Sequence, residues 1–348
     1  KNLGYLFRTS HDLTETYDTA VKCAADFIGT HAVALWEKGV DNCFVMRACH
    51  GFEKFKEQNL KIRSTEGIIS QVIKTQDVVV IEDVANNESY VHPEMIAGAN
   101  FKWLLCVPMF FANEVFGVID IYSKRPHGFF EQEIDYLKAL ASQAGVAIQN
   151  AKLIDHFNSI GQTITSSRNI KEILENVAKS AIDVLCAEPV TLFQYDQAIN
   201  RLMRPPIYAG KLLEQEGYVE TFVFSGRSFA ELIVVGGESL YIEKDIDQHP
   251  LMIEAKKYVI NGMPKRRFTE REKIESLAAL ILRVENEIVG LMFLNYRTPQ
   301  TFTPIEKKIM ETFAAHAAIA IKNSRLIEQM RRNNEQMRHH KEYMEAII

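Results

Sequence analysis

Cysteine side chains are the residues of this chain best suited to covalent or redox chemistry. The sequence contains five of them, Cys23, Cys43, Cys49, Cys106 and Cys186. Their odd number and wide spacing indicate reduced thiols in a cytoplasmic protein. No histidine or lysine motif around them argues for a lowered thiol pKa, which a nucleophilic cysteine needs. A cysteine-based enzyme is therefore an alternative interpretation and not the favoured one.

Length and composition limit the classes of protein to consider. The chain has 348 residues, 47% of them apolar and 24% charged, with a net charge of −5. This length is sufficient for two hydrophobic cores. The absence of a basic excess predicts no nucleic-acid partner, and the lack of a run of 18 apolar residues predicts no membrane contact through a spanning helix. The chain opens with KNLGYLF, without an initiator methionine or a signal sequence, so we expect a fragment of a longer protein.

An internal repeat is the most informative feature of the sequence. Asn113–Ile154 aligns without a gap with Asn286–Ile327, 173 residues further on, and 13 of the 42 positions are identical. Such a repeat predicts a duplicated domain of about 150 residues. The matched Gly117 and Gly290 lie in strand patterns, where we expect another segment of backbone or a helix to approach closely. We expect domain 1 at residues 1–154, domain 2 at 155–327 and a C-terminal helix at 328–348.

Both halves alternate amphipathic helical segments with short β-branched and aromatic runs. In the first half, a helix is expected from about His11 to Gly29. A hairpin is expected from Trp103–Phe111 and Val115–Ser123, with Asn113 in the turn because asparagine adopts positive φ at low cost. The second half repeats this order of elements. Strands joined mostly by hairpins and flanked by helices predict the α+β fold class.

The end of the chain has the spacing of a coiled coil. From residue 327 onward the pattern advances in steps of three and four, with methionine at each d position and polar residues at two a positions. A polar a position favours a defined register in two parallel strands. We therefore expect a parallel homodimer, although a charged tail that is helical in a monomer is the alternative. The expected seam consists of Ile327, Met330, Asn334, Met337, Lys341 and Met344.

Residues between the two expected domains show the same spacing. Leu153, Phe157 and Ile160 follow one another in steps of four and three. They predict either a second dimer seam or a helix that packs on its own sheet. The spacing favours neither alternative.

Several segments together resemble the GAF domain family. They are GVIDIYS at Gly117–Ser123, RPHGFFEQE at Arg125–Glu133 and ALASQAGVAIQNAKL at Ala139–Leu153. Related patterns recur as GLMFLNY at Gly290–Tyr296 and TPQTFTPIE at Thr298–Glu306. The resemblance covers nearly the whole chain except its tail, and its motifs are mostly structural.

This resemblance implies a fold and a type of function. Each copy would be a six-stranded antiparallel sheet flanked by helices, with loops that enclose a small-molecule pocket. The two copies would be joined by a long helix. Such domains resemble the sensory regions of bacterial-type signalling proteins, which include histidine kinases of two-component systems, diguanylate cyclases and phosphodiesterases.

The resemblance also suggests where a ligand would bind. Asp120 and Tyr122 share one face of a strand, and by analogy with the family this more polar face turns toward the pocket. The neighbouring strand and the covering loop supply the other candidates in domain 1, and corresponding segments supply those in domain 2. No metal site is expected, and the identity of a cofactor stays open. The candidates are Tyr90, His92, Trp103, Cys106, Phe110, Asp120 and Tyr122 in domain 1, and Tyr241, His249, Phe293 and Asn295 in domain 2.

These observations predict a non-catalytic sensory and regulatory fragment. It would bind a small molecule or dimerise, and would pass a conformational signal through its C-terminal helix to a kinase or cyclase domain outside this chain. A ligand-free dimerisation scaffold is one alternative. A cysteine-based enzyme of the methionine sulfoxide reductase type, which also has this fold, is a less favoured one.

Overall fold

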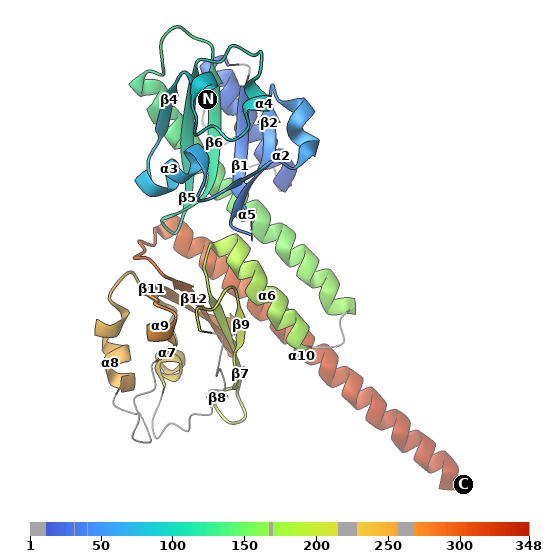
Figure 1. Cartoon of the computed structure of the whole chain (residues 1–348). Helices are drawn as coiled ribbons and strands as arrows, with labels where there is room; N and C mark the ends of the chain where they lie inside the picture. The colour runs from blue at the N-terminus through green and yellow to red at the C-terminus, as the bar shows by residue number, and fades with distance from the viewer. Residues whose placement is uncertain are drawn as a thin grey trace. The chain divides into compact units, whose positions relative to one another are not determined.

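The chain folds into two compact units, Lys1–Asp155 and His156–Ile348. The computed structural model describes residues 12–30, 32–39, 41–166, 170–214, 228–256 and 267–347; the side chains of residues 57, 160–166 and 341–347 are not among those described. Each unit combines one antiparallel sheet with helices on its faces (Figure 1). The predicted α+β fold class is therefore confirmed.

Unit 1 is built on a six-stranded antiparallel sheet in the order β3-β2-β1-β6-β5-β4. Strands β1 and β6 form its centre, and the long hairpin of β5 and β6 continues the sheet on one side. This is the six-stranded sheet that the resemblance predicted. The strands are β1 (Ala32–Lys38), β2 (Cys43–His50), β3 (Lys61–Arg63), β4 (Val79–Glu82), β5 (Trp103–Phe111) and β6 (Glu114–Ser123).

Two helices, α2 (Leu13–Ile28) and α5 (Glu131–Ser166), pack on one face of this sheet. Helix α2 begins where the Asp12 side chain accepts a hydrogen bond from the backbone N–H of Glu15, at 2.9 Å, and it ends at Gly29 with φ 66°. An acidic N-cap and a left-handed glycine satisfy end groups that the helix itself leaves unpaired. The sequence therefore defines both ends of this helix locally.

The opposite face of the unit 1 sheet is covered by short elements. These pack over an apolar cluster that includes Trp36, Phe44, Ile69 and Leu104. Short helices joined by loops leave room for polar side chains to reach the sheet, and the candidate site lies on this face. The elements are η1 (Glu53–Gln58), α3 (Gly67–Thr75), η2 (Val84–Asn86) and α4 (Pro93–Ile96).

Two backbone features of the β5–β6 hairpin follow from residue type. The turn has positive φ at Ala112 (47°) and at Asn113 (56°), so the predicted role of Asn113 is confirmed, whereas Ala112 is not a residue that favours this conformation. A Cβ atom on Gly117 would lie 3.0 Å from the carbonyl oxygen of Trp36. The predicted close approach of backbone at Gly117 is therefore confirmed.

The sheet of unit 2 has the order β10-β11-β12-β7-β8, and β9 also pairs with β7. A Cβ atom on Gly290 would lie 2.5 Å from the carbonyl oxygen of Phe193, so the prediction for Gly290 is confirmed as well. This contact is the counterpart of the one between Gly117 and Trp36, and it makes Phe193 the structural equivalent of Trp36. The strands are β7 (Val190–Asp196), β8 (Arg201–Leu202), β9 (Ile207–Ala209), β10 (Leu240–Ile242), β11 (Ser276–Val284) and β12 (Glu287–Tyr296).

Helices cover both faces of the unit 2 sheet. Helices α6 (Ile170–Leu185) and α10 (Pro304–Ile347) pack on one face, and α10 then continues well beyond the sheet (Figure 1). The other face carries an apolar cluster to which α7 and α8 contribute. Its elements are α7 (Phe229–Gly236), η3 (Ile246–Gln248), α8 (Pro250–Lys256) and α9 (Phe268–Arg271).

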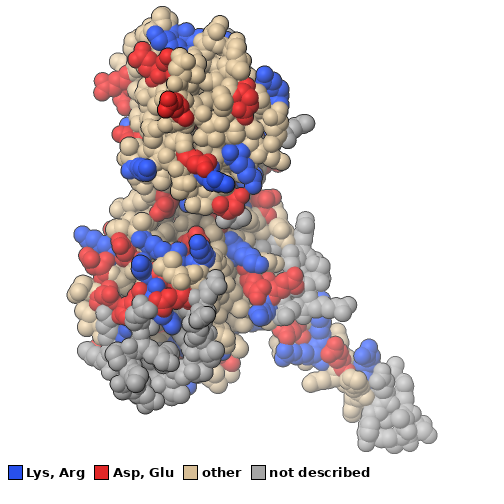
Figure 2. Space-filling view, viewed as in Figure 1, with Lys and Arg blue, Asp and Glu red and all other residues tan. Residues whose placement is uncertain are grey.

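The surface carries both signs of charge. On the face shown in Figure 2, acidic and basic side chains are interspersed, as the small net charge of −5 would suggest. A phosphate-binding surface would instead gather basic residues on one face. Among the described residues, no helix is long and apolar enough to cross a membrane.

Candidate functional site

A small cavity lies in unit 1 between the sheet and the loop that carries residues 89–92. Its volume is about 20 Å³, which is enough for one or two water molecules. Four side chains predicted from the sequence come together in its lining: Tyr90, His92, Asp120 and Tyr122. The remaining lining is mainly aliphatic, apart from Trp36 of β1.

Asp120 and Trp36 present buried polar atoms to this cavity. Asp120 is 4% exposed and Trp36 is 1% exposed. Neither Oδ1 of Asp120 nor Nε1 of Trp36 makes a hydrogen bond of normal geometry with any residue that the structure describes. A buried polar group without a partner costs about 1–3 kcal/mol. A water molecule or a ligand that bonded to these two atoms would recover that energy.

The Asp120 carboxyl changes its charge near neutral pH. Burial raises its pKa to about 7, while the Cys106 thiol and the Trp36 indole act in the opposite sense by favouring the carboxylate. Cys106 faces Asp120 across the pairing of β5 with β6, and burial raises the pKa of its thiol well above the usual value. The thiol is therefore protonated and is a hydrogen-bond donor.

Tyr90 and His92 hold the covering loop against the sheet. The hydroxyl oxygens of Tyr90 and Tyr122 lie 2.9 Å apart. The imidazole of His92 stacks on the indole of Trp36, with ring centroids 5.9 Å apart. Its Nδ1 lies 2.9 Å from Oε1 of Glu94, and its Nε2 lies 3.1 Å from the carbonyl oxygen of Lys61. These contacts position the loop over the cavity.

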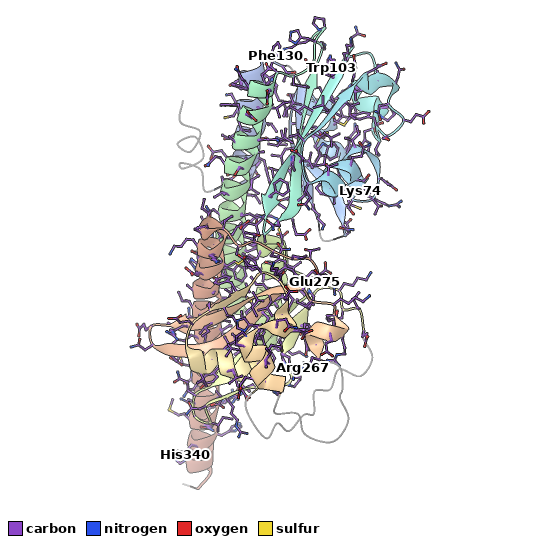
Figure 3. The ribbon with its side chains drawn as sticks, turned by 90° about the vertical axis from the view of Figure 1, so that its left-hand side faces the viewer. Lys74, Trp103, Phe130, Arg267, Glu275 and His340 are labelled. Carbon is purple, nitrogen blue, oxygen red and sulfur yellow. The ribbon has the colours of Figure 1, made fainter. Side chains whose placement is uncertain are left out.

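The other three candidates of domain 1 lie apart from the cavity lining. Cys106 is buried beside Asp120, directly opposite it in the pairing of β5 with β6. Side chains alternate along a strand, so Trp103 points to the helix side, where its ring packs at Gly128 and lies near Phe130 at the beginning of α5 (Figure 3). Phe110 follows the irregularity between Met109 and Phe110 and is 40% exposed. The structure thus places Trp103 and Phe110 outside this cavity, in contrast to the prediction.

Trp36 is the aromatic residue of the cavity lining that the sequence analysis did not name, and the aliphatic lining residues and Ser89 were not named either. Its strand was predicted, but a strand of nearly continuous apolar residues does not reveal which of its two faces meets the pocket. The pairing of β1 with β6, which sets Ala34 opposite Asp120, resolves this question. A large aromatic residue at the end of that run was the available signal.

In unit 2 the equivalent positions are filled by phenylalanine. The pairing of β12 with β7 sets Phe293 opposite Thr191, just as Asp120 faces Ala34, so Phe293 is the counterpart of Asp120. Phe293 packs against Phe193, the counterpart of Trp36, with ring centroids 6.1 Å apart. Both belong to the apolar cluster of this unit. The polar pair of unit 1 is therefore replaced by a packed aromatic pair.

The other three candidates of domain 2 do not gather around Phe293. Tyr241 packs against Phe302, and Lys307 of α10 lies over its ring, which places it on the helix side of the sheet. Burial raises the pKa of Tyr241 to about 12. His249 accepts a hydrogen bond from the backbone N–H of Leu251, and burial lowers its pKa. These contacts place Tyr241 and His249 apart from Phe293, and their pocket role stays a prediction.

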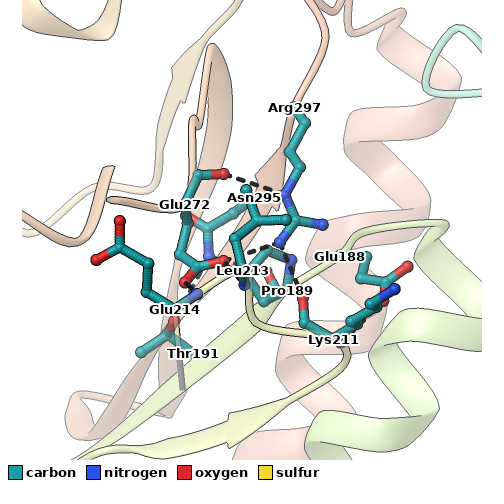
Figure 4. A network of polar contacts seen from close by, with 9 residues as sticks. All are labelled: Glu188, Pro189, Thr191, Lys211, Leu213, Glu214, Glu272, Asn295 and Arg297. Carbon is teal, nitrogen blue, oxygen red and sulfur yellow. Dashed lines mark hydrogen bonds and ion pairs between the residues drawn. The ribbon is translucent and has the colours of Figure 1, made fainter. Parts of the chain in front are cut away.

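Asn295 takes part in the polar network that Figure 4 shows. Its side-chain amide donates to the carbonyl oxygen of Pro189, at 2.9 Å, and so connects the end of β12 to the segment before β7. Next to it, Glu272 is fully buried and accepts from the backbone N–H of Leu213 (2.8 Å) and from Arg297 (2.9 Å). These bonds support the loop of unit 2 and leave Glu272 well satisfied.

The predicted seam between the domains packs within the chain where it is described. Leu153 is 4% exposed, so little of its surface is left for a partner chain. Phe157 packs against Phe313 and His316 of α10. Both observations match the alternative in which this helix packs on its own chain. The side chain of Ile160 lies outside the described residues.

The C-terminal seam lies on α10 where that helix extends past the sheet. Met330 is 64% exposed and Met337 is 66% exposed. Asn334 is also exposed, and Ile327 is partly buried. Lys341 and Met344 continue the helix, but their side chains lie outside the described residues. An apolar residue at each described d position is thus available for contact.

An antiparallel sheet with long helices on one face, and with a loop-covered cavity on the other, defines a class of domain that is typically sensory or regulatory. The chain belongs to the GAF domain family, whose sequence model matches residues 12–148 and 169–321. The resemblance inferred from the sequence is confirmed at the level of the family.

A relative with a regulatory name has a similar sequence. It is the Nif-specific regulatory protein of Azospirillum lipoferum, which is 22% identical over 192 residues. The matched region comprises 52% of this chain but 29% of that protein. This chain therefore spans less than a third of the relative that it matches.

Solved structures with a similar fold come from several kinds of protein. The GAF domain of an Acinetobacter phosphoenolpyruvate-protein phosphotransferase is 21% identical, with a TM-score of 0.39, and covers 43% of this chain and 89% of that chain. Free methionine-R-sulfoxide reductase from Neisseria meningitidis, in complex with its substrate, is 14% identical, with a TM-score of 0.38, and covers 52% and 93%. These likenesses concern the fold alone.

Proposed function

We propose that this chain is a non-catalytic sensory region in which unit 1 binds a small molecule and unit 2 does not. The observation that carries this proposal is the contrast between the two units. In unit 1, Asp120 and Trp36 line a cavity, and Oδ1 of Asp120 and Nε1 of Trp36 are buried without a hydrogen bond of normal geometry to the described residues. In unit 2, Phe293 and Phe193 fill the equivalent positions. A copy with a closed apolar cluster supports the fold, whereas a copy with unsatisfied polar groups is suited to recognise a ligand.

The cavity restricts the ligand. A volume of about 20 Å³ admits only a small polar group while the loop is in its present position. A larger ligand would require the loop at residues 89–92 to move, which breaks the Tyr90–Tyr122 contact. Ligand binding and loop position are thus linked. A ligand that binds better to one position of the loop shifts the population toward that position.

The long helices are the proposed path of the signal. Helix α10 presents exposed Met330 and Met337 in the register of a two-stranded coiled coil, with Asn334 at an a position. We propose that two chains pair in parallel along this segment and convey the state of the domains to an output domain outside this chain. The output is a kinase or a cyclase, or a regulatory domain such as the relative's name indicates.

Two alternative functions make different predictions. A ligand-free scaffold would dimerise but would hold no small molecule in unit 1. A thiol-based enzyme would need a cysteine with a lowered pKa, whereas burial raises the pKa of both Cys49 and Cys106. This property of the two thiols argues against the enzyme. It leaves the sensory function and the scaffold as the main candidates.

Native mass spectrometry of the purified chain tests the proposal. We expect a dimer with additional mass that is lost under denaturing conditions, and we expect Asp120→Asn and Trp36→Phe to reduce that mass. The exposed Asp18, which pairs with Lys56 on the surface, provides the control Asp18→Asn. A dimer without additional mass, even after incubation with cell extract, would favour the scaffold. A monomer would contradict the proposed seam.

A further inference from the structure

Trp36 and Glu37 are neighbours on β1 and serve opposite faces of the sheet. Trp36 lines the cavity, whereas Glu37 points toward the helices and is 1% exposed. Because consecutive side chains of a strand point in opposite directions, these two residues share a short piece of backbone. A displacement of Trp36 therefore acts on the position of Glu37.

Glu37 contacts side chains from three other elements. The Nζ atom of Lys152 on α5 lies 3.0 Å from Oε1 of Glu37, so the two groups form an ion pair. The geometry of this contact is not that of a normal hydrogen bond. The hydroxyl of Tyr17 on α2 donates to Oε2 at 2.8 Å. The Nε–H of Arg47 on β2 donates to the same oxygen at 2.9 Å. One carboxylate thus joins the central strand to both helices.

The strand is irregular at this point. The pairing of β1 with β2 sets Leu35 opposite Ala48 and Trp36 opposite Met46. Arg47 is therefore the extra residue of a bulge, and it is the residue that reaches Glu37. Bulges redirect side chains and bend the strand that contains them. The sheet has a local deformation where cavity and helices meet.

The buried ion pair of Glu37 and Lys152 does not stabilise the fold more than apolar residues at the same positions would. Lys152 is 5% exposed, so both charges are removed from water. The desolvation of such a pair is about as large as its mutual attraction, and well-packed apolar residues give equal or greater stability. What the pair supplies is a specific position of α5 relative to β1.

Unit 2 has the corresponding connection with a neutral acceptor in place of the carboxylate. Arg325 of α10 lies 173 residues after Lys152 and is its counterpart in the repeat. Arg325 bonds to the side chain of Gln194, the counterpart of Glu37, at 3.2 Å, and also to the carbonyl oxygens of Tyr195 and Val289. In unit 2 the helix is thus bonded largely to backbone, and the adjacent Phe193 packs against Phe293 and beneath the guanidinium of Arg204.

We propose that Glu37 and Lys152 are the positioning residues through which the cavity of unit 1 acts on helix α5. This inference rests on the proposed function, because it assigns the route by which the ligand's effect leaves the cavity. A change at Asp120 or Trp36 displaces β1 at the bulge and changes the geometry of the Glu37–Lys152 pair. Helix α5 then shifts between two positions. The Glu37–Lys152 ion pair is thus the proposed link between the cavity and helix α5. Its position between the two would not by itself establish coupling, which has to be measured.

Hydrogen exchange in a double-mutant cycle tests this route. Asp120→Asn perturbs the cavity, and exchange is followed at the amides of residues 146–155 of α5. We expect Asp120→Asn to change these rates by at least about twofold in the otherwise native chain, and to leave them nearly unchanged in the Glu37→Gln/Lys152→Met background, which is a departure from additivity. Both charges are removed together so that neither is left buried without its partner.

Arg325→Met provides the matched control. It removes the corresponding connection of unit 2, and we expect the effect of Asp120→Asn on α5 to persist in that background. The reverse direction is measured through Trp36, which becomes the sole tryptophan once Trp103 is replaced by Phe. We expect Glu37→Gln/Lys152→Met to shift its emission and Arg325→Met to leave it unchanged. Coupling between two sites must be reciprocal.

The outcomes separate this inference from the proposed function. If Asp120→Asn alters α5 equally with and without the Glu37–Lys152 pair, or does not alter it at all, the route is overturned. A ligand detected by native mass spectrometry would in that case leave the proposed function intact. If the coupling is present but no ligand is found, the proposed function fails and the route stands.

Discussion

The hydroxyl oxygens of Tyr90 and Tyr122 lie 2.9 Å apart, with the two rings close to perpendicular at 83°. One tyrosine belongs to the loop over the cavity, and the other is fully buried on β6. Burial raises the pKa of both hydroxyls, so both remain protonated and one donates to the other. This hydrogen bond holds the loop against the sheet.

Replacing Tyr90 with phenylalanine is expected to destabilise unit 1 by about 1–2 kcal/mol, because the buried hydroxyl of Tyr122 loses its partner. Both tryptophans of the chain, Trp36 and Trp103, lie in unit 1. Urea unfolding followed by tryptophan fluorescence therefore reports on this unit. Tyr136→Phe is the control, since Tyr136 also lies in unit 1, where its ring stacks on Phe27 away from the cavity. An equal effect of both changes would show that the hydrogen bond between Tyr90 and Tyr122 does not stabilise unit 1.

Asp120 is expected to make the stability of unit 1 fall as pH rises. Its pKa in the folded chain, about 7, lies above its ordinary value of 3.8, so the folded state holds more protons between these two pH values. The contribution of Asp120 to the unfolding free energy is complete below its ordinary pKa of 3.8 and is lost as pH rises through its folded-state pKa of about 7. Between about pH 4 and pH 8, the unfolding free energy of the native chain should fall relative to that of Asp120→Asn by an amount on the order of 3 kcal/mol.

The sign of this effect has an internal control. The Lys61 side chain and the backbone N–H of Cys43 lower the pKa of the exposed Asp41. The contribution of Asp41 is therefore present above its ordinary pKa and is lost in acid, which is the opposite direction. Unfolding curves of Asp120→Asn and Asp41→Asn across the pH range distinguish the two cases. A parallel pH dependence of native chain and Asp120→Asn would show that Asp120 does not titrate there.

Asn334→Leu is expected to tighten the homodimer, because a polar residue at an a position costs stability while it defines register. Sedimentation equilibrium should show a dissociation constant at least about tenfold lower, and Met337→Gln should raise it. Gln336 lies two positions further on, outside the seam, so Gln336→Leu should have little effect. A dimer affinity that none of these changes alters would exclude this segment as the interface.

Arg297→Met is expected to destabilise unit 2 by about 3 kcal/mol or more, since it leaves the fully buried Glu272 without its cationic partner. Hydrogen exchange of the unit 2 strands measures the loss, because this unit contains no tryptophan. The control is Arg332→Met, which removes an exposed ion pair between Arg332 and Glu328, both on α10. This change should lower the unfolding free energy by less than about 0.5 kcal/mol. Comparable losses in both variants would show that Glu272 does not depend on Arg297.

The accuracy of the sequence predictions followed the range of the interactions. Three predicted features depend only on neighbours along the chain or on one adjacent strand, and each is observed. They are the turn at Asn113, the close backbone approach at Gly117, and the helix between Asp12 and Gly29. The pocket was predicted only in part. Trp103 was named as a pocket candidate, whereas in the structure its ring packs at Gly128 and does not line the cavity.

The amino-acid pattern alone was enough to recognise the internal repeat, the α+β class and the long terminal helix. These properties follow from identities at a fixed shift and from periodic patterns, which do not require knowledge of strand pairing. The contacts between distant residues become known from the three-dimensional structure: Trp36 with Asp120 at the cavity, Phe193 with Phe293 in unit 2, and Glu37 with Lys152 on the helix side of the unit 1 sheet. The physical reason is register, since a shift of one residue between β1 and β6 would move Trp36 and Asp120 to opposite faces of the sheet, and a shift between β7 and β12 would do the same to Phe193 and Phe293.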